Sequence, residues 1–228
     1  MRVLVTRPRE DAGRLIRVLA GLGIDAIATP LLDITYVDGA ALDLSGVQAL
    51  VLTSANGARA FARRSSNRTL PALCVGDATR REAEALGFGT VKSADGDVQA
   101  LADLIKADLD PDGGAVLHPA GSHVAGDLGG QIEAAGFTYR REALYTAKKI
   151  KTLPQAASQA LATGDVDGVL LYSPRTAAAF ATLAQATALG TVTAYCLSAA
   201  VADKISNLGW RDVKIAAQPN QDALLVLL

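Results

Sequence analysis

An internal repeat constrains the fold of this chain more than any other feature of its sequence. Apolar and glycine positions near the N-terminus recur at a constant offset of 113 residues, and later matches keep their order at offsets of 119 to 123. The matched pairs are Val3/Val116, Gly13/Gly126, Leu15/Leu128, Leu19/Ile132, Gly23/Gly136, Ser54/Ser173, Phe61/Phe180, Cys74/Cys196, Phe88/Trp210 and Leu101/Leu224. Because the order is kept and the offset drifts so little, the pattern indicates duplication of one unit rather than chance.

Within each half of the repeat, short apolar runs alternate with stretches of helical periodicity. The apolar runs predict buried strands at 3–5, 49–52, 73–75, 116–117, 169–171 and 194–197. After the first run, Leu15, Leu19 and Leu22 recur at intervals of three and four residues, as on one face of a helix. Alternating strands and helices imply parallel sheets with right-handed crossovers. The sequence therefore predicts a doubly wound α/β fold.

Glycines and extended segments predict where the elements end and how the halves are connected. Four glycines are placed to end helices in the left-handed C′ conformation. They are Gly23, Gly87, Gly136 and Gly209. The run Gly126–Gly130 is expected inside a helix. Two lightly apolar segments, Pro30–Asp38 and Ala143–Lys149, occupy equivalent places in the two halves, and we expect them to connect two domains as extended ribbons.

The segments that follow the expected strands are rich in Ser, Thr, Asn and Gly. They are 6–8, 53–57, 76–79, 118–122, 173–176 and 198–200. Ligands of open parallel sheets bind outside the carboxyl ends of the strands, where free helix N–H groups favour anions. A plainer interpretation assigns helix N-caps alone to Ser54, Asp77, Ser122, Ser173 and Ser198. Since several such segments face one edge, the pattern favours an anionic ligand.

Familiar cofactor and metal motifs are missing from the sequence. No Gly-x-Gly-x-x-Gly follows a strand, and there is neither a Walker A lysine nor a Gly-x-Ser-x-Gly elbow. His118 and His123 are separated by a strand-to-helix turn, which is not a helical metal-ligand spacing. We therefore interpret His118 as a loop histidine at the rim of the cleft, and we expect neither a metal nor a cofactor.

Composition limits the partners and the compartment. The 22 basic and 23 acidic residues are spread along the chain, so we expect no nucleic-acid or membrane-surface partner. Cys74 and Cys196 lie far apart without a Cys-x-x-Cys spacing, which indicates packing cysteines in a reducing compartment. No apolar run has the length of a signal peptide or a membrane span, so the cytoplasm is the expected location.

Tyr145 is the residue with the most open interpretation. It lies in the second ribbon, at a place equivalent to Leu32 of the first. A phenolic hydroxyl between two domains can act as a general acid or as a positioning donor. The alternative is a packing tyrosine whose hydroxyl meets water, and the residues alone favour this alternative.

Taken together, five motifs resemble those of the uroporphyrinogen-III synthase family. They are VLVTRP at 3–8, LTSANGARAF at 52–61, VGDAT at 75–79, LYT at 144–146 and GVLLYSPRT at 168–176. The resemblance covers the whole chain in order. It implies two flavodoxin-like domains joined by a two-stranded ribbon, with the chain crossing from one domain to the other and back. The first domain would combine 1–37 with 148–228, and the second would be 40–145.

The resemblance also implies an activity. The substrate would be hydroxymethylbilane, a linear tetrapyrrole with acetate and propionate side chains. Loss of its terminal hydroxyl gives an azafulvene, ring D attacks through its substituted carbon, and a spiro intermediate fragments and recloses with ring D inverted. The family needs no cofactor, and we expect a cytoplasmic monomer.

The resemblance also assigns roles to residues of this chain, according to their positions in the matched motifs. Tyr145 falls on the tyrosine that is proposed to help the hydroxyl leave. The expected substrate-binding residues are Arg7, Thr53, Ser54, Asn56, Gly76, Thr79, His118, Ser173 and Ser198.

Two other classes of function remain open at this stage. Two α/β domains with a hinge also suit a non-catalytic sensor or binding module for a polycarboxylate. A nucleotide-dependent enzyme would use the same strand ends, although the sequence lacks a glycine-rich phosphate loop.

Overall fold

The strand β1 (Arg2–Val5) illustrates how a short apolar run builds layers. Side chains alternate across a strand. Val3 and Val5 therefore pack with α1 (Arg9–Gly21) on one face, while Leu4 packs into a separate core on the other face. All three side chains are fully buried. Because the strand is apolar on both faces, helices must cover both.

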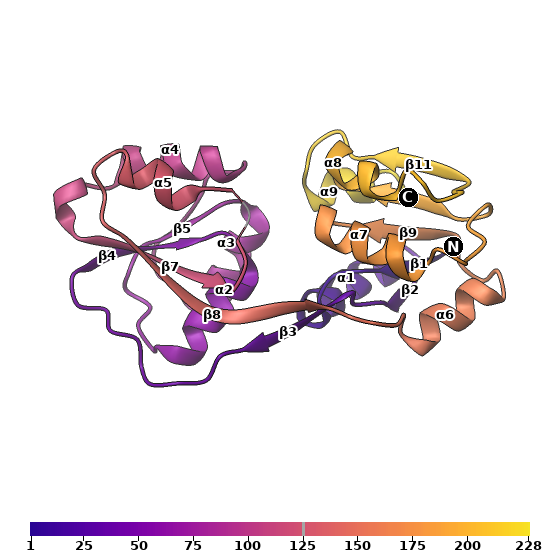
Figure 1. The fold of residues 1–228 in the computed structure, drawn as a ribbon, viewed down its shortest axis with the longest axis horizontal. Helices are drawn as coiled ribbons and strands as arrows, with labels where there is room; N and C mark the ends of the chain where they lie inside the picture. The colour runs from indigo at the N-terminus through magenta and orange to yellow at the C-terminus, as the bar shows by residue number, and fades with distance from the viewer. Residues whose placement is uncertain (125) are drawn as a thin grey trace. The chain divides into compact units, whose positions relative to one another are not determined.

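The computed structural model describes residues 1–124 and 126–228. Contacts divide the chain into two units (Figure 1). The first unit combines Met1–Asp33 with Lys148–Leu228, and the second consists of Ile34–Ala147. Each unit has its own sheet and its own hydrophobic cores.

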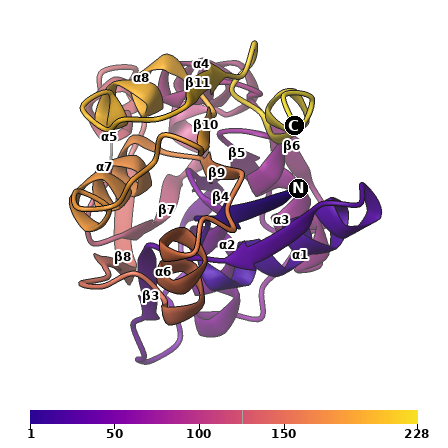
Figure 2. The ribbon, with the colours of Figure 1, turned by 90° about the vertical axis from the view of Figure 1, so that its right-hand side faces the viewer.

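The first unit has a five-stranded sheet of order β11-β10-β9-β1-β2, and every pair in it is parallel. Its further elements are β2 (Asp25–Ala28), α6 (Gln155–Ala162), β9 (Gly168–Leu171), α7 (Pro174–Leu183), β10 (Thr193–Cys196), α8 (Ala199–Ala202), the 3-10 helix η2 (Asp203–Ile205), β11 (Asp212–Ile215) and α9 (Gln221–Leu225). Helices α6 and α7 cover one face of the sheet, and α1 and α9 cover the other (Figure 2).

The second unit has a six-stranded sheet of order β3-β8-β7-β4-β5-β6. The pairs from β8 to β6 are parallel. Its elements are β3 (Leu32–Tyr36), which begins at the end of the first unit, β4 (Val47–Leu52), α2 (Ala55–Arg64), β5 (Ala72–Cys74), α3 (Asp77–Ala85), β6 (Val91–Ser93), α4 (Val98–Asp108), the 3-10 helix η1 (Pro111–Gly113), β7 (Ala115–Gly121), α5 (Leu128–Glu133) and β8 (Tyr139–Lys149). Helices α2 and α3 pack on one face, and α4 and α5 pack on the other.

Each sheet combines strands from both halves of the sequence repeat. In the first unit, β1 from the first half pairs with β9 from the second. In the second unit, β4 from the first half pairs with β7 from the second. The repeat-matched residues Phe61 and Phe180 are both fully buried, one in each unit. Burying one such side chain contributes about 1.5–3 kcal/mol.

The prediction of an α/β fold with parallel sheets is confirmed, and strands lie at all six predicted positions. Gly23, Gly87 and Gly136 have positive φ angles of 73°, 90° and 87°, as helix-ending glycines require. The prediction for Gly209 is wrong, because the preceding 3-10 helix ends at Ile205 and Gly209 has no positive φ. In the described part of the chain, no helix is long and apolar enough to cross a membrane.

The prediction that 118–122 is a helix-opening loop is also wrong. Strand β7 continues through Gly121, because β8 pairs with it from Val116 to Gly121. Pro119 fits there since β4 pairs with β7 only as far as Leu117, and the missing N–H of a proline therefore breaks no ladder on that side. Helix α5 begins later, with Asp127 as its N-cap, so Ser122 is not a cap and the glycine run 126–130 spans the helix start.

Candidate active site

The strand orders of both sheets create a switch point in each unit. In the second unit, the helices that follow β4 and β7 pack on opposite faces of the sheet. A crevice forms at such a point outside the carboxyl ends of the two strands, and ligands of doubly wound proteins bind there. Thr53 and Ser54 directly follow β4, so the structure places two of the expected binding residues at this point.

Ser54 is the N-cap of α2, and its hydroxyl has two partners. Its Oγ accepts a hydrogen bond from the Gly57 N–H at 3.2 Å, and it lies 2.8 Å from the hydroxyl of Tyr145. The N-cap interpretation of Ser54 is therefore confirmed, and the same oxygen holds the phenol. The sequence-based alternative for Tyr145, a hydroxyl that meets only water, does not fit this contact.

Tyr145 lies in β8 and is anchored at the end of β7. Its carbonyl accepts from the Ser122 N–H at 2.8 Å, and it stands opposite Gly121 after a bulge in the pairing of β7 with β8. A side chain at Gly121 would approach the Tyr145 ring to 3.0 Å, so glycine leaves the space that the ring occupies. The phenol is thereby held beside the N-terminus of α2.

His118 is a buried strand residue, which corrects its interpretation as a loop histidine at the rim. Only 1% of it is exposed. Its Nε2 lies 2.9 Å from Thr53 Oγ1, and its Nδ1 lies 2.6 Å from the Tyr139 hydroxyl. Burial, together with the nearby charge of Arg141, lowers the pKa of the imidazole to about 4. The ring is therefore neutral near pH 7.

A cavity of about 160 Å³ opens at the same place. It is lined by Thr53, His118, Val124, Gly126, Asp127, Leu128, Gly129, Tyr139 and Arg141. A volume of this size holds on the order of five water molecules, or one short polar side group of a ligand. Arg141 donates to the carbonyls of Gly121 and Ser122 at 2.6 and 3.0 Å and contributes positive charge.

In the first unit, the switch point lies between β1 and β9, and Arg7 follows β1 there. Its Nη1 donates to Gln221 Oε1 at 3.0 Å, and its guanidinium lies 4.8 Å from the centre of the Tyr172 ring. A weak ion pair with Asp11 has an N···O distance of 3.9 Å. These contacts hold the cation at the strand ends.

Tyr172, which directly follows β9, was not singled out by the sequence analysis. Its hydroxyl is buried and has no hydrogen-bond partner among the described residues. Burial raises the pKa of this phenol, so it stays protonated. An unsatisfied buried hydroxyl costs about 1–3 kcal/mol, which sets Tyr172 apart from the packing residues around it.

The other expected binding residues differ in whether their side chains already form hydrogen bonds within their own helices. Ser173 and Thr176 form a reciprocal capping box at the start of α7, which favours capping alone for Ser173. Ser198 is an N-cap whose side chain makes no capping hydrogen bond. Gly76, not Asp77, is the N-cap of α3, and Asp77 is the first helical residue. Thr79 is buried in the first turn of α3.

Asn56 is directed to its own helix, since its Oδ1 accepts from Arg59 at 3.1 Å. Cys74 and Cys196 are buried and unpaired, and burial raises the pKa of each thiol to about 12, which confirms their interpretation as packing residues. The described residues contain no group of three or more His, Cys, Asp or Glu side chains placed to hold a metal ion.

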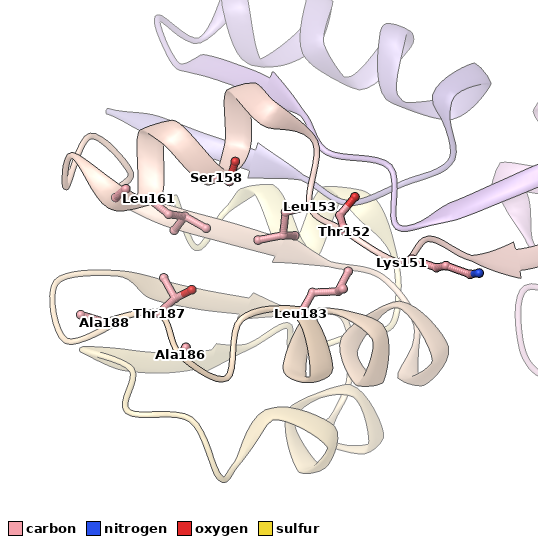
Figure 3. A pocket seen from close by; sticks show the side chains of 10 residues that line it. Lys151, Thr152, Leu153, Ser158, Leu161, Leu183, Ala186, Thr187 and Ala188 are labelled. Atoms are coloured by element: carbon pink, nitrogen blue, oxygen red, sulfur yellow. The ribbon is translucent and has the colours of Figure 1, made fainter.

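A larger cavity, of about 570 Å³, lies in the first unit (Figure 3). It is lined by α6, by the end of α7 and by the segment leading to β10, so it lies toward the amino ends of the strands. Lys151 is the only charged residue among those that line it. Its lining has the hydroxyls of Thr152, Ser158 and Thr187 but no imidazole, and it lies away from the carboxyl ends of the strands, so the switch points remain the better candidates.

Tyr139 and Arg141 were not predicted as site residues, because the extended segment was expected to start only at residue 143. Strand β8 begins at Tyr139, and these two residues, two positions apart, both line the cavity. The run Tyr-Arg-Arg-Glu-Ala-Leu at 139–144 has no alternation of apolar and polar residues, so local periodicity gave no signal that the strand begins at Tyr139.

The fold and the site define an α/β protein whose switch points present hydroxyl, imidazole and guanidinium groups, the arrangement in which such folds bind small polar ligands. Its family is shown by comparison with known proteins. The chain belongs to the uroporphyrinogen-III synthase family, because residues 13–226 match the family described as uroporphyrinogen-III synthase HemD. The predicted resemblance is thus confirmed, and the chain is an enzyme of tetrapyrrole biosynthesis.

Solved structures agree with the fold. The chain is similar to uroporphyrinogen-III synthetase from Helicobacter pylori, with 17% identity, a TM-score of 0.66, and coverage of 100% of this chain and 98% of the other. It is also similar to a mutant uroporphyrinogen III synthase from Thermus thermophilus, with 15% identity, a TM-score of 0.55, and coverage of 99% and 96%. No curated protein sequence matched the chain.

Proposed function

We propose that this enzyme dehydrates and cyclises hydroxymethylbilane to uroporphyrinogen III with inversion of ring D. The hydrogen bond between Tyr145 and Ser54 at the N-terminus of α2 carries the proposal, because it holds the phenolic hydroxyl at the start of this helix. The phenol hydrogen-bonds the departing hydroxyl and assists its loss. Tyr145 is the catalytic residue in this scheme.

The substrate carboxylates are bound by dispersed donors. Thr53 and His118 line the cavity at the end of β4, with Ser54 next in the chain, and this volume accepts one acetate or propionate group. Backbone N–H groups at the start of α2 and α3 add neutral donors and a positive helix end. Gly76 supports this role, since its lack of a side chain leaves the start of α3 open.

On the first unit, Arg7 is the charged ligand-binding group. Charge-assisted hydrogen bonds to carboxylates are worth about 1.5–3 kcal/mol. Asn56, Thr79 and Ser198 contribute at the neighbouring strand ends, and Ser173 contributes only by capping α7, which orients the start of that helix. The Ser198 hydroxyl makes no capping hydrogen bond to its own helix.

The larger arrangement belongs to the same proposal. Two flavodoxin-like domains, 1–37 with 148–228 and 40–145, are joined by a two-stranded ribbon that the chain crosses twice. Both sheets support this division through their strand order. The enzyme acts without a cofactor as a cytoplasmic monomer and binds neither nucleic acid nor membrane. Holding a flexible bilane in the cyclising shape supplies much of the rate.

Incubation of the purified protein with freshly prepared hydroxymethylbilane tests the proposal. After oxidation of the product, chromatography separates the inverted from the uninverted porphyrin isomer. We expect the inverted isomer with the protein and the uninverted isomer without it. A protein that binds the bilane but leaves the isomer ratio unchanged would be a polycarboxylate-binding module instead. Dependence on an added nucleotide would indicate the nucleotide-dependent alternative.

A further inference from the structure

Tyr139, the buried His118 and Thr53 form a partly buried chain of hydrogen bonds that ends at the start of α2. The Tyr139 hydroxyl lies 2.6 Å from Nδ1 of His118, and Nε2 on the other side of the ring lies 2.9 Å from Thr53 Oγ1. We propose that Tyr139 and His118 are positioning residues, which fix the Thr53 hydroxyl as a hydrogen-bond donor toward a ligand carboxylate. This inference rests on the proposed function, since it requires an anionic ligand at the end of β4.

The protonation state of the imidazole allows only two arrangements of the protons along this chain of hydrogen bonds. His118 is buried beside Arg141 and is neutral near pH 7, so it carries a single N–H. It must therefore donate one of its two hydrogen bonds and accept the other. Thr53 and Tyr139 consequently have opposite roles.

In the first arrangement, Tyr139 donates to Nδ1, and Nε2–H donates to Thr53. The proton of Thr53 is then free to be donated to a ligand. In the second arrangement, Nδ1–H donates to Tyr139, and Thr53 donates to Nε2. Thr53 then presents only lone pairs, which repel a carboxylate, and the Tyr139 proton has no acceptor among the described residues.

Chemistry and distance both favour the first arrangement. A phenol is more acidic than an aliphatic alcohol, so it is the better donor to an imidazole lone pair, and the alcohol oxygen is the better acceptor. The Tyr139 hydroxyl lies 2.6 Å from Nδ1, whereas Thr53 Oγ1 lies 2.9 Å from Nε2, so the contact with Tyr139 is the shorter of the two. Short separations are typical of O–H donors.

Packing fixes the positions of Tyr139 and His118 relative to each other. Tyr139 and His118 lie on the paired strands β8 and β7. A side chain at Gly129 would approach the Tyr139 ring to 2.8 Å, so α5 closes tightly over the phenol only because glycine stands there. The Tyr139 hydroxyl is therefore held in place beside the buried His118 ring.

Nitrogen NMR of the full chain labelled with ¹⁵N-histidine tests the proton arrangement without reference to activity. The chain has only 2 histidines, and a His123→Gln variant leaves the signals of His118 alone. We expect the proton of His118 on Nε2 at pH 7. A proton on Nδ1, or a doubly protonated ring, would overturn the proposal whether or not the protein cyclises the bilane.

A double-mutant cycle tests the link to the ligand. Tyr139→Phe should raise KM for hydroxymethylbilane about 3- to 10-fold, the usual value of one hydrogen bond, with kcat changed less than about 3-fold. In a Thr53→Val background the same change should alter KM less than about 2-fold, because the hydroxyl on which Tyr139 acts is gone. An equal effect in both backgrounds would assign Tyr139 a merely structural role, and the His123→Gln control should match the parent chain.

Discussion

Hydroxyl groups dominate the polar chemistry at the strand ends of the second unit. Ser54 caps a helix with the same oxygen that contacts Tyr145, and Thr53 contacts the imidazole of His118. Neutral donors of this kind bind carboxylates without holding a permanent charge in an empty site. In the proposed function they let a chain with a net charge of only −1 bind a polyanion.

Removing the Tyr145 hydroxyl tests its catalytic role. We expect Tyr145→Phe to lower kcat by roughly 10- to 1,000-fold, within or just below the usual effect of one acid–base group. The loss of its contact with Ser54 should lower the free energy of unfolding by only about 1 kcal/mol. Steady-state cyclisation kinetics and urea unfolding measure the two effects.

Tyr195→Phe is the matched control for Tyr145. Its ring lies against Gly168 at the amino end of β9, away from the strand ends that form the site, so activity should be unchanged. Full activity of Tyr145→Phe would instead make Tyr145 a packing residue, with the acid supplied by water or by the substrate.

Burial of neutral His118 makes stability depend on pH. The pKa is lowered from 6.5 to about 4 on folding, so between these values the unfolded chain binds the proton and the folded chain does not. The free energy of unfolding should therefore fall as pH falls from about 6.5 toward 4, by up to about 3 kcal/mol. A His118→Gln variant should show a flatter profile in urea titrations over this range. Parallel profiles for the two proteins would show that His118 does not carry the effect.

At the scale of elements, the approach of α2 to β7 decides where Thr53 and Ser54 lie. Gly57, in the first turn of α2, has no room for a side chain, because a Cβ would collide with the carbonyl oxygen of Pro119. The helix can rest on the strand only at a glycine. This contact fixes the N-terminus of α2 against the same strand that carries His118.

A glycine pair tests this contact. Gly57→Ala should lower the free energy of unfolding by about 1–3 kcal/mol through overpacking and should raise KM by displacing the N-terminus of α2. Gly13→Ala in α1 meets no atom within 4 Å and should instead raise stability by about 0.5–1 kcal/mol through helix propensity. Thermal unfolding of both variants would show that the two substitutions change stability in opposite directions. Equal stabilisation would mean that α2 moves away freely.

At the scale of the whole molecule, each unit contains a complete set of layers. The second unit has its own cores on both faces of its sheet, built from residues between Leu42 and Tyr139. The first unit draws its sheet from both ends of the chain. Separate cores predict that the units are separable folding domains.

The fragment 34–147 should therefore fold alone, with a dispersed NMR spectrum and a cooperative urea transition. The fragment 1–113, which contains one half of the sequence repeat, should not fold, because β1 and β4 would lack their partners β9 and β7. A folded 1–113 with an unstructured 34–147 would contradict both the unit boundaries and the proposed domains.

The sequence alone predicted the element types, the repeat, the parallel α/β class and the strand ends at which Arg7, Thr53 and Ser54 lie. These features follow from local periodicity and from the position of each residue within its own element. The exchange of segments between two domains came from the family resemblance, not from the periodicity.

Only the tertiary structure decided how the site is assembled. The partners Thr53 and His118 are 65 residues apart, and Ser54 and Tyr145 are 91 residues apart. Such contacts depend on the register of β7 with β8 and on where β4 stops pairing with β7, which no local pattern encodes. Pro119 and Gly121 favour a loop by their local preferences. The strand continues through them because backbone pairing with β8 outweighs those preferences, and that continuation buries His118.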